Sequence, residues 1–489
     1  MNNLFNGNRA YLWYALLTSL FLLFIFKLFY PYPNLVVDSY VYIKAAHLNW
    51  GVNSFPIGYS RFLQLFHFFT DSATALVCFQ YLFLEFACLC FFYTLLFFFQ
   101  PHKWVRLLLF LFLFVNPLLL YMSNFVMADT LFTTISLLWL TQLIWIIWQP
   151  RAWMIVTHAI LIALAFAIRY NALYYPLFAT LVFLVCRMKL WLKVIGIALQ
   201  FLLVGSFILY TQGQMKTLTG ISQFSPFGGW KLANCALYMY GHVYKEDHRV
   251  IPAKFSHLDS MVRDYFDKTG KVDVLLDYNS RTHGNFYSSS YTSPLNRFKY
   301  LRFGNDTIFQ DFKTWGVVGA LYGEYGFWLI RNHPFSYFNY FTAPNLYRFC
   351  NPPIEIFQYH TPYELRSDNF GHMAADWFKL HTLAVPDSHI RLRTSIIAFF
   401  PTLILVVHMV FAIYFLSFLF SKVRRSLPWA YKMTLYCIGL LWLTDCLFNA
   451  TASGIVMRYL VFTTIMELGT ALILIDFIYS KAKEPAQPS

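Results

Sequence analysis

The sequence predicts an all-α polytopic membrane protein with about ten transmembrane helices and a large folded polar region between the seventh and the eighth. Of its 489 residues, 58% are hydrophobic and 12% are charged, and the hydrophobic residues gather in long runs. A helix of about 20 apolar residues covers the roughly 30 Å of hydrocarbon in a bilayer. So apolar a chain cannot enclose all of its runs in one water-soluble core, and we expect them to lie in lipid.

Ten apolar runs account for the expected helices. They cover residues 10–30, 73–99, 104–121, 125–148, 154–168, 172–186, 190–210, 395–420, 429–448 and 455–479. The fifth and sixth are halves of one stretch that is too long for a single helix and that Arg169-Tyr170-Asn171 interrupts. We therefore predict two short helices there, and this count decides which side of the membrane every later segment faces.

The net charge of +14 indicates topology rather than nucleic-acid binding, because the basic residues lie mostly in short turns between apolar runs. With a cytoplasmic N-terminus and ten spans, the inner turns carry Arg9, Lys103, Arg106, Arg151, Arg187, Lys189, Lys193, Lys422, Arg424, Arg425, Lys432, Lys481 and Lys483. The short outer turns keep only Lys44, Arg61, Arg169 and Arg458. This asymmetry predicts that residues 211–394 lie outside the cytoplasm.

The predicted organisation has four parts. Residues 1–210 form an N-terminal transmembrane module of about seven spans, whose first outer loop is 31–72. Residues 211–394 form an extracytoplasmic cap of mixed α or α/β structure, with helical patterns at 258–266, 315–332 and 334–349. Residues 395–480 supply three further spans, and 481–489 are a cytoplasmic tail.

The first outer loop contains Asp38, the residue that we expect to act as a general base. Tyrosines, Lys44 and His47 follow it at helical spacing, and Pro56-Ile57-Gly58-Tyr59 separates them from a second amphipathic stretch. The pattern predicts two short helices on the membrane surface with a carboxylate at the rim. The alternative is that Asp38 is an ordinary exposed loop acid.

Two Arg-Tyr pairs lie at the outer ends of predicted spans, Arg169-Tyr170 and Arg458-Tyr459. A guanidinium matches a phosphate group in a bidentate fork, so both pairs are candidate phosphate-binding residues. The alternative is that these arginines only extend to lipid headgroups. A carboxylate and phosphate-binding residues beside a membrane suit an enzyme that transfers a sugar from a lipid-phosphate carrier to an acceptor. For such an enzyme, candidate contacts to the sugar or the acceptor are Tyr40, Lys44, Tyr59 and Trp230.

A second candidate catalytic carboxylate, Asp129, begins the fourth span. It would orient the acceptor, hold a divalent cation with Asp38, or shift the pKa of Asp38 through like charge. An acid at a helix N-terminus is also favoured by the helix dipole alone. Near the outer end of the ninth span, Asp445 is expected to pair with Arg458.

Four ionisable residues lie inside predicted spans, where charged groups are costly and are often functional. They are Glu85, His158, His408 and Glu467. The sequence shows no pair among them, so we expect hydrogen bonds within the bundle.

Several short motifs, in order and on one predicted side, resemble the GT-C glycosyltransferases, a family of polytopic enzymes that use polyprenyl-phosphate sugars. The motifs are Asp38-Ser39-Tyr40 with Ala45-Ala46, Pro56-Ile57-Gly58-Tyr59-Ser60-Arg61-Phe62, Asn116-Pro117, Met127-Ala128-Asp129-Thr130-Leu131-Phe132, Arg169-Tyr170-Asn171-Ala172-Leu173, Phe227-Gly228-Gly229-Trp230 with Asn234, Ile330-Arg331-Asn332-His333-Pro334, and Arg458-Tyr459. The resemblance is to protein O-mannosyltransferases and lipid A aminoarabinose transferases in particular.

The resemblance implies an inverting transfer of sugar from a polyprenyl-phosphate carrier to a hydroxyl of a lipid, glycan or protein acceptor. It also implies a site on the periplasmic face of a bacterial inner membrane. Ser39 follows Asp38 where the mannosyltransferases often carry Glu, and Asp129 stands where Glu is common. These departures leave the use of a divalent cation open, and no other cofactor is implied.

Two rival classes remain at this point. A transporter or flippase of lipid-linked glycans would place polar sites near the bilayer midplane and often shows repeats, whereas the candidates here gather at one face. An outer-face acyltransferase or glycan polymerase would be indicated by an intramembrane histidine, for which His158 and His408 are available.

Overall fold

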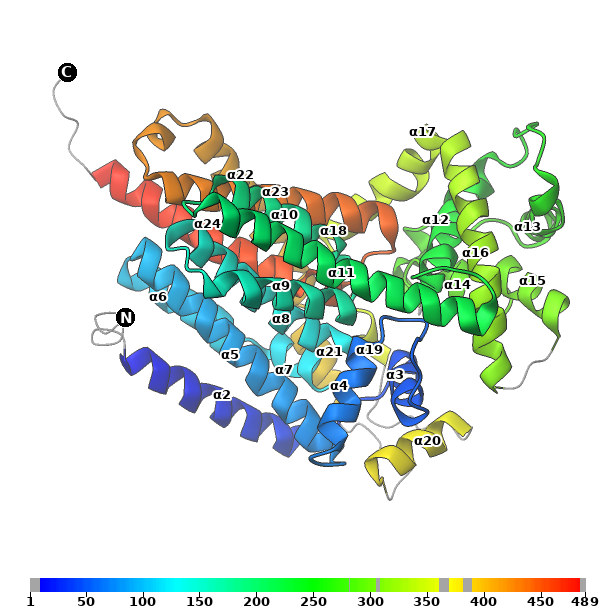
Figure 1. Cartoon of the computed structure of the whole chain (residues 1–489), viewed down its shortest axis with the longest axis horizontal. Helices are drawn as coiled ribbons and strands as arrows, with labels where there is room; N and C mark the ends of the chain where they lie inside the picture. Colours follow the sequence, from blue (N-terminus) through cyan, green and yellow to red (C-terminus); the bar gives the residue numbers. More distant parts are fainter. Residues whose placement is uncertain (1–8, 281, 305–307, 360–368, 381–388, 484–489) are drawn as a thin grey trace.

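The computed structural model describes residues 9–280, 282–304, 308–359, 369–380 and 389–483, and these residues form an α-helical protein. A bundle of long helices occupies one part of the molecule, and a group of shorter helices caps one end of the bundle (Figure 1). The described residues contain no β-strand, and a single isolated bridge joins Asn34 to Phe125. The described part of residues 211–394 is therefore helical rather than α/β.

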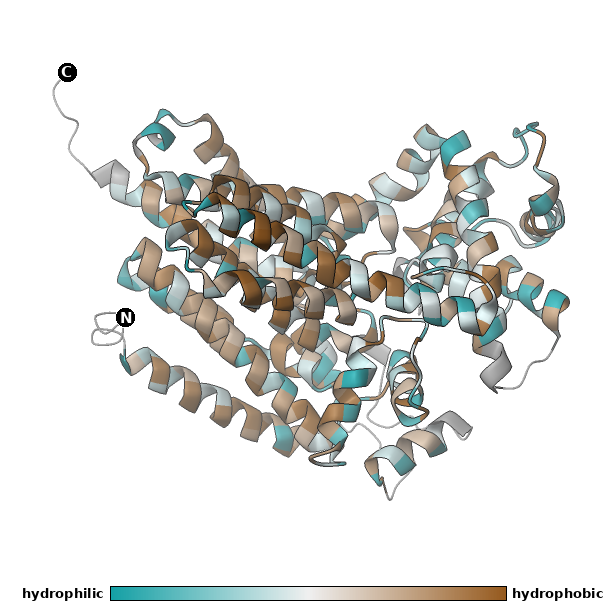
Figure 2. Cartoon of the chain, viewed as in Figure 1, coloured by the Kyte–Doolittle hydropathy of each residue, from teal (hydrophilic) through white to brown (hydrophobic). Residues whose placement is uncertain are grey.

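Eight helices or helix pairs are long and apolar enough to cross a membrane, which is consistent with an integral membrane protein. They are α2 (Arg9–Phe29), α5 (Ala73–Phe99), α6 (Lys103–Phe114) with α7 (Pro117–Ser123), α8 (Ala128–Trp148), α11 (Leu190–Thr219), α21 (Ile390–Ile397) with α22 (Phe400–Phe420), α23 (Trp429–Ala452), and η6 (Met457–Leu460) with α24 (Val461–Lys483). Figure 2 shows hydrophobic residues along these helices and hydrophilic residues in the cap.

The divided stretch forms two shorter apolar helical segments. They are α9 (Trp153–Ile168) and a 3-10 turn η1 (Tyr170–Tyr174) that continues into α10 (Tyr175–Val185). Arg169 is the extended residue between them, with φ −147° and ψ 134°. A short connector, η5 (Lys422–Ser426), follows α22.

Residues 31–72 form the two expected short helices, α3 (Val37–His47) and α4 (Gly58–His67). A Cβ on Gly58 would lie 2.4 Å from the carbonyl oxygen of Ala167, so the start of α4 packs directly on the backbone at the end of α9. Only glycine permits this approach. The packing brings the loop that carries Asp38 toward Arg169.

The start of α8 is also tied to the first loop. Asn116 caps α7 by accepting a hydrogen bond from the Leu118 amide at 3.0 Å, and Pro117 begins that helix. The segment that follows α7 forms two backbone hydrogen bonds with Asn34. The Asn34 amide donates to the Asn124 carbonyl at 2.8 Å, and the Val126 amide donates to the Asn34 carbonyl at 3.1 Å. Consequently α8 begins at Ala128 rather than at residue 125, with Asp129 beside the Asp38 loop.

The cap has its own hydrophobic core, separate from that of the bundle. The helices around this core are α12 (Pro226–Val243), η2 (Ala253–Phe255), α13 (Ser256–Thr269), η3 (Leu276–Asn279), α14 (Phe286–Ser289), α15 (Pro294–Phe303), α16 (Ile308–Asn332), α17 (Pro334–Tyr337) and the π-helical turn η4 (Phe338–Thr342). The cap continues with α18 (Ala343–Cys350), α19 (Ile356–Tyr359) and α20 (Asn369–Phe378), whose buried hydrophobic residues pack in the core of the bundle instead. Helices α12 and α16 meet backbone to backbone, since a Cβ on Gly229 would lie 1.8 Å from the carbonyl oxygen of Gly319.

The substitution Gly229→Ala is expected to destabilise the cap by about 1–3 kcal/mol, because the added methyl must push α12 and α16 apart. The measurement is the thermal unfolding of the purified protein in detergent. Gly213→Ala is the matched control, since a Cβ at Gly213 in α11 meets nothing within 4 Å. Equal melting temperatures for the two variants would contradict the close helix contact.

Candidate functional site

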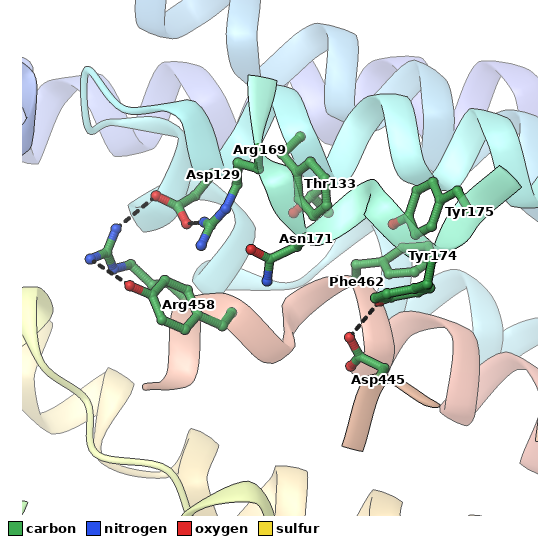
Figure 3. A pocket seen from close by; sticks show the side chains of 11 residues that line it. Asp129, Thr133, Arg169, Asn171, Tyr174, Tyr175, Asp445, Arg458 and Phe462 are labelled. Atoms are coloured by element: carbon green, nitrogen blue, oxygen red, sulfur yellow. Dashed lines mark hydrogen bonds and ion pairs between the residues drawn. The ribbon is translucent and has the colours of Figure 1, made fainter. Parts of the chain in front are cut away.

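Four charged residues from distant parts of the chain meet where the cap joins the bundle. Asp38 lies in the first turn of α3, Asp129 in the first turn of α8, Arg169 between α9 and η1, and Arg458 in η6. Arg169 and Arg458 both point at the Asp129 carboxylate (Figure 3). We call these four residues and Glu355, described next, the acid–arginine cluster.

Arg458 is the centre of this cluster. Its side chain is only 9% exposed and its guanidinium contacts three carboxylates. Nε and Nη2 donate to Glu355 at 2.7 and 3.2 Å, and Nη1 donates to Asp129 at 2.9 Å. The contact between Nη2 and Asp38 is longer, 3.5 Å. Asp38 is therefore the carboxylate that Arg458 holds least tightly.

The ring of Tyr459 lies against both arginines. The guanidinium carbon of Arg169 is 4.5 Å from the centre of this ring, and that of Arg458 is 4.9 Å from it. Arg169 also lies 5.5 Å from the ring of Phe132. Cation–π attraction of this kind fixes the direction of each guanidinium plane. Tyr459 thus holds two like charges side by side.

Glu355 belongs to the cluster and was not anticipated from the sequence. It follows Pro352-Pro353 and has a left-handed backbone, with φ 50°, which is uncommon for a residue other than glycine. The Met457 amide donates to the Pro353 carbonyl at 3.1 Å, so the Glu355 loop is bonded to η6 itself. No local motif marks this glutamate, because only the fold brings it to Arg458.

Lys231 of α12 brings a further positive charge from the cap. Its ammonium group donates to Asn285 and, at 3.2 Å, to Ser453, and lies 5.0 Å from the ring of Phe227. Burial lowers the pKa of Lys231 to about 8, and Asp38 and Glu355 are close enough to oppose that shift. Three carboxylates, two guanidiniums and this ammonium leave the region formally neutral.

Asp38 and Asp129 have different surroundings. The Asp129 side chain is 5% exposed and is ion-paired with both arginines, whereas the Asp38 side chain is 30% exposed. Burial raises the pKa of Asp38 above its usual value; Arg458 opposes this, and the negative charges of Glu355 and Asp129 add to it. Of the two carboxylates, Asp38 is the more accessible, and Asp129 is the one that contacts both arginines.

A narrow pocket extends from the cluster into the bundle, with about 340 Å³ of space between its atoms when open solvent is included. It is lined by Asp129, Phe132, Thr133, Arg169, Asn171, Tyr174, Tyr175, Asp445, Arg458, Tyr459 and Phe462 (Figure 3). Asp445 does not pair with Arg458, contrary to the expectation. It accepts hydrogen bonds from Tyr174 at 2.7 Å, Thr463 at 2.5 Å and Asn449 at 2.9 Å, and these three donors satisfy it without an arginine.

Several predicted contact residues lie away from the cluster. Tyr59 and Trp230 are fully buried, with the Tyr59 hydroxyl bonded to Gln80 at 2.7 Å and the Trp230 indole bonded to the Trp315 carbonyl at 3.0 Å. The Tyr170 hydroxyl donates to the Phe224 carbonyl at 2.8 Å. These side chains pack the bundle and the cap, so the structure gives no support to their assignment as ligand contacts.

The remaining two predicted contacts, Tyr40 and Lys44, are buried on α3. Lys44 places its ammonium group 5.0 Å from the ring of Trp50, within the first loop. Both residues therefore contribute to the packing that orients α3 and Asp38.

The ionisable residues inside the spans all have partners. Ser19 donates to Glu85 at 2.9 Å, and the Trp139 indole lies 3.1 Å from the Nε2 atom of His158. Nδ1 of His408 and Oε1 of Glu467 are 2.7 Å apart. These contacts are hydrogen bonds within the bundle, as expected, and the His408–Glu467 pair is not visible in the sequence because α22 and α24 become adjacent only on folding.

Hydrogen bonds from the cap hold the loop that leads to Arg458. Asn345 donates to the carbonyls of Ala450, at 3.1 Å, and Ser453, and accepts from the Ile455 amide at 3.1 Å. Gly284 and Gly454 approach so closely that a Cβ on Gly454 would lie 2.9 Å from the Gly284 Cα. The position of Arg458 therefore depends on the cap as well as on the bundle.

Among the residues that the structure describes, no three His, Cys, Asp or Glu side chains are grouped to hold a metal ion. Asp38 and Asp129 both face a guanidinium. The cluster therefore offers a base beside two cations that are shaped for phosphate.

The chain has no match among protein-family models, curated proteins or solved structures.

Proposed function

We propose that this protein is a GT-C-type inverting glycosyltransferase that moves a sugar from a polyprenyl-phosphate carrier to an acceptor hydroxyl. The observation that carries the proposal is the meeting of Asp38, Asp129, Arg169 and Arg458 at one end of the apolar helices. A lipid-linked donor would reach such a site from the bilayer, with its phosphate at the height of the arginines.

The proposed reaction is a single displacement. Asp38 accepts the proton of the acceptor hydroxyl while the hydroxyl oxygen attacks the anomeric carbon of the donor sugar. The bond from that carbon to the phosphate oxygen breaks at the same time. The released lipid phosphate takes the bonding electrons, and Arg458 and Arg169 stabilise its charge. One displacement inverts the anomeric centre.

Asp129 and Glu355 have a supporting role in this scheme. Both hold guanidinium groups in place before the donor arrives. Because the cluster has no net positive charge even with Lys231 included, a bound phosphate must take over N–H groups that now face carboxylates. Asp38, with the longest contact to Arg458, is the first that it displaces.

The proposed orientation follows from the charge asymmetry of the turns. With two short spans at α9 and η1–α10 the chain crosses the membrane ten times, and the cap lies outside the cytoplasm. A bacterial inner membrane, with the site on the periplasmic face, fits the resemblance to the GT-C enzymes.

The test is transfer by the purified full-length protein in oriented vesicles. A defined polyprenyl-phosphate sugar is supplied to one face or the other, and sugar on a panel of lipid, glycan and peptide acceptors is measured. Transfer only when the cap side has donor and acceptor supports the proposal. No transfer from any donor, together with translocation of lipid or solute, would exclude it.

The pH dependence of transfer is the second test. Asp38 must be ionised to act as a base, and burial raises its pKa above 3.8. Transfer is therefore expected to fall as the pH decreases through this raised pKa, at a pH higher than an ordinary aspartate would give. Rates are measured under kcat/KM conditions, with tryptophan fluorescence as the control for folding. A flat profile down to pH 4 would contradict the role of Asp38.

One observation favours a second candidate, a proton-coupled transporter. His408 and Glu467 form a buried pair between two apolar helices, and such pairs occur in proton relays. If the protein is a transporter, His408→Gln abolishes translocation in vesicles. Sugar transfer that survives this substitution favours the glycosyltransferase.

A further inference from the structure

The C-terminal ends of α22 and α24 lie at the end of the bundle away from the cap (Figure 1). A second pocket lies between these ends and the connector η5. It offers about 610 Å³ of space, part of it open to solvent, and is roomier than the pocket at the cluster. Its lining residues are Ser417, Phe418, Ser421, Arg424, Leu474, Phe477 and Ile478. Nothing in the proposed sugar transfer uses this pocket.

The pocket has an apolar wall and a polar mouth. Phe477 and Ile478 supply the accessible apolar surface, with the buried Phe418 and Leu474 behind them. Arg424 and Ser421 lie on the connector side. Nη1 of Arg424 donates to the Leu419 carbonyl at 2.5 Å, at the end of α22. This bond uses one of the five guanidinium N–H groups and fixes the arginine at the mouth.

The pocket also lies at the ends of two candidate spans, where lipid headgroups are expected. Arg424 follows the last residue of α22, Phe420, by four positions, and Phe420 and Ile478 are exposed. The apolar wall therefore belongs to the ends of two candidate spans, and the arginine lies just beyond them. Lys422 and Arg425, both exposed, make the rim positive.

We propose that this pocket binds one molecule of an anionic glycerophospholipid from the leaflet opposite the acid–arginine cluster. Arg424 and the Ser421 hydroxyl hold the phosphate, and an acyl chain lies along Phe477 and Ile478. Basic pockets between transmembrane helices recognise anionic headgroups in this way. The combination of charge and apolar wall selects a lipid over a free phosphate, which would leave the apolar wall uncovered.

The test is native mass spectrometry of the full-length protein, titrated in detergent with phosphatidylglycerol or with phosphatidylcholine of the same acyl chains. We expect one phosphatidylglycerol to be retained in preference to phosphatidylcholine. Arg424→Gln is expected to weaken its binding about tenfold or more, since it removes charge-assisted hydrogen bonds. Arg425→Gln is the matched control, with the same charge change one residue away and outside the lining.

A second variant tests the apolar wall without changing charge. Ser417→Phe fills the pocket from α22 and is expected to reduce phosphatidylglycerol binding about tenfold. Size-exclusion profiles identify any variant that fails to fold. If one of Arg424→Gln and Ser417→Phe does not fold, lipid binding by the other tests the site. Equal losses in Arg424→Gln and Arg425→Gln would overturn the site in favour of diffuse charge attraction. If glycerol 3-phosphate competes with phosphatidylglycerol at equal concentration, the ligand of the pocket is a soluble phosphate compound and not a phospholipid.

Discussion

Asp38→Asn is expected to lower sugar transfer by about 10²–10⁴-fold while donor binding and folding stay close to those of the parent. Asparagine keeps the size of the side chain and removes nearly all of its basicity. The Asp38 side chain is 30% exposed and has only a 3.5 Å contact with Arg458, so its charge contributes little to the fold. The measurement is single-turnover transfer from a defined polyprenyl-phosphate sugar, with donor binding followed separately.

The matched control for this substitution is Asp71→Asn. Asp71 lies at the end of the same loop and pairs with Lys379, whose side chain is 73% exposed. This pair includes neither Arg169 nor Arg458. Its loss is expected to leave transfer unchanged. Full transfer by Asp38→Asn would remove Asp38 from the mechanism and make Asp129 the next candidate base.

Arg458→Lys is expected to weaken donor use by about 10–100-fold although it keeps the positive charge. A lysine ammonium cannot reproduce the fork with which Arg458 now contacts Glu355, and it cannot offer that fork to a phosphate. The loss is read from kcat/KM for the donor and from direct donor binding. Arg169→Lys is expected to act in the same direction, because its guanidinium is held by Asp129 and Tyr459.

Arg61→Lys controls for the change from arginine to lysine. Arg61 is exposed in α4 and donates to Asn49, Gln64 and the Trp50 carbonyl. Its substitution is expected to leave donor use unchanged. If Arg458→Lys and Arg169→Lys also left donor kinetics unchanged, both arginines would have only a structural role at the membrane surface.

The helical architecture was predictable from the sequence because its signals are local. The run at residues 73–99 coincides with α5, which begins at the capping residue Ser72 and ends before the left-handed Gln100. The division at Arg169 and the two short helices around Pro56 follow from equally local interruptions. Hydropathy and turn residues suffice for such elements.

The composition of the cluster was only partly predictable. Asp38, Asp129, Arg169 and Arg458 stood out because each follows or begins an apolar run. Glu355 did not, since it lies in a long polar region without a distinguishing pattern.

Sequence also did not separate aromatic packing from ligand contact. Trp230 and Lys231 are neighbours on α12, and successive side chains of a helix point about 100° apart. Trp230 therefore enters the core of the cap while Lys231 faces Ser453. The packing of α12 against the C-terminal helices decides whether Trp230 or Lys231 lies toward the cluster. The residue periodicity within α12 does not reveal this packing.

The contact between Gly284 and Gly454 means that the cap is not an exchangeable module. Grafting residues 226–350 onto another helix bundle would separate them from the segment 450–460 that they hold, and Arg458 would lose its placement. The two segments are therefore expected to be inherited together, with paired small residues at positions 284 and 454. A chimaera that retains the donor specificity of this chain must carry both.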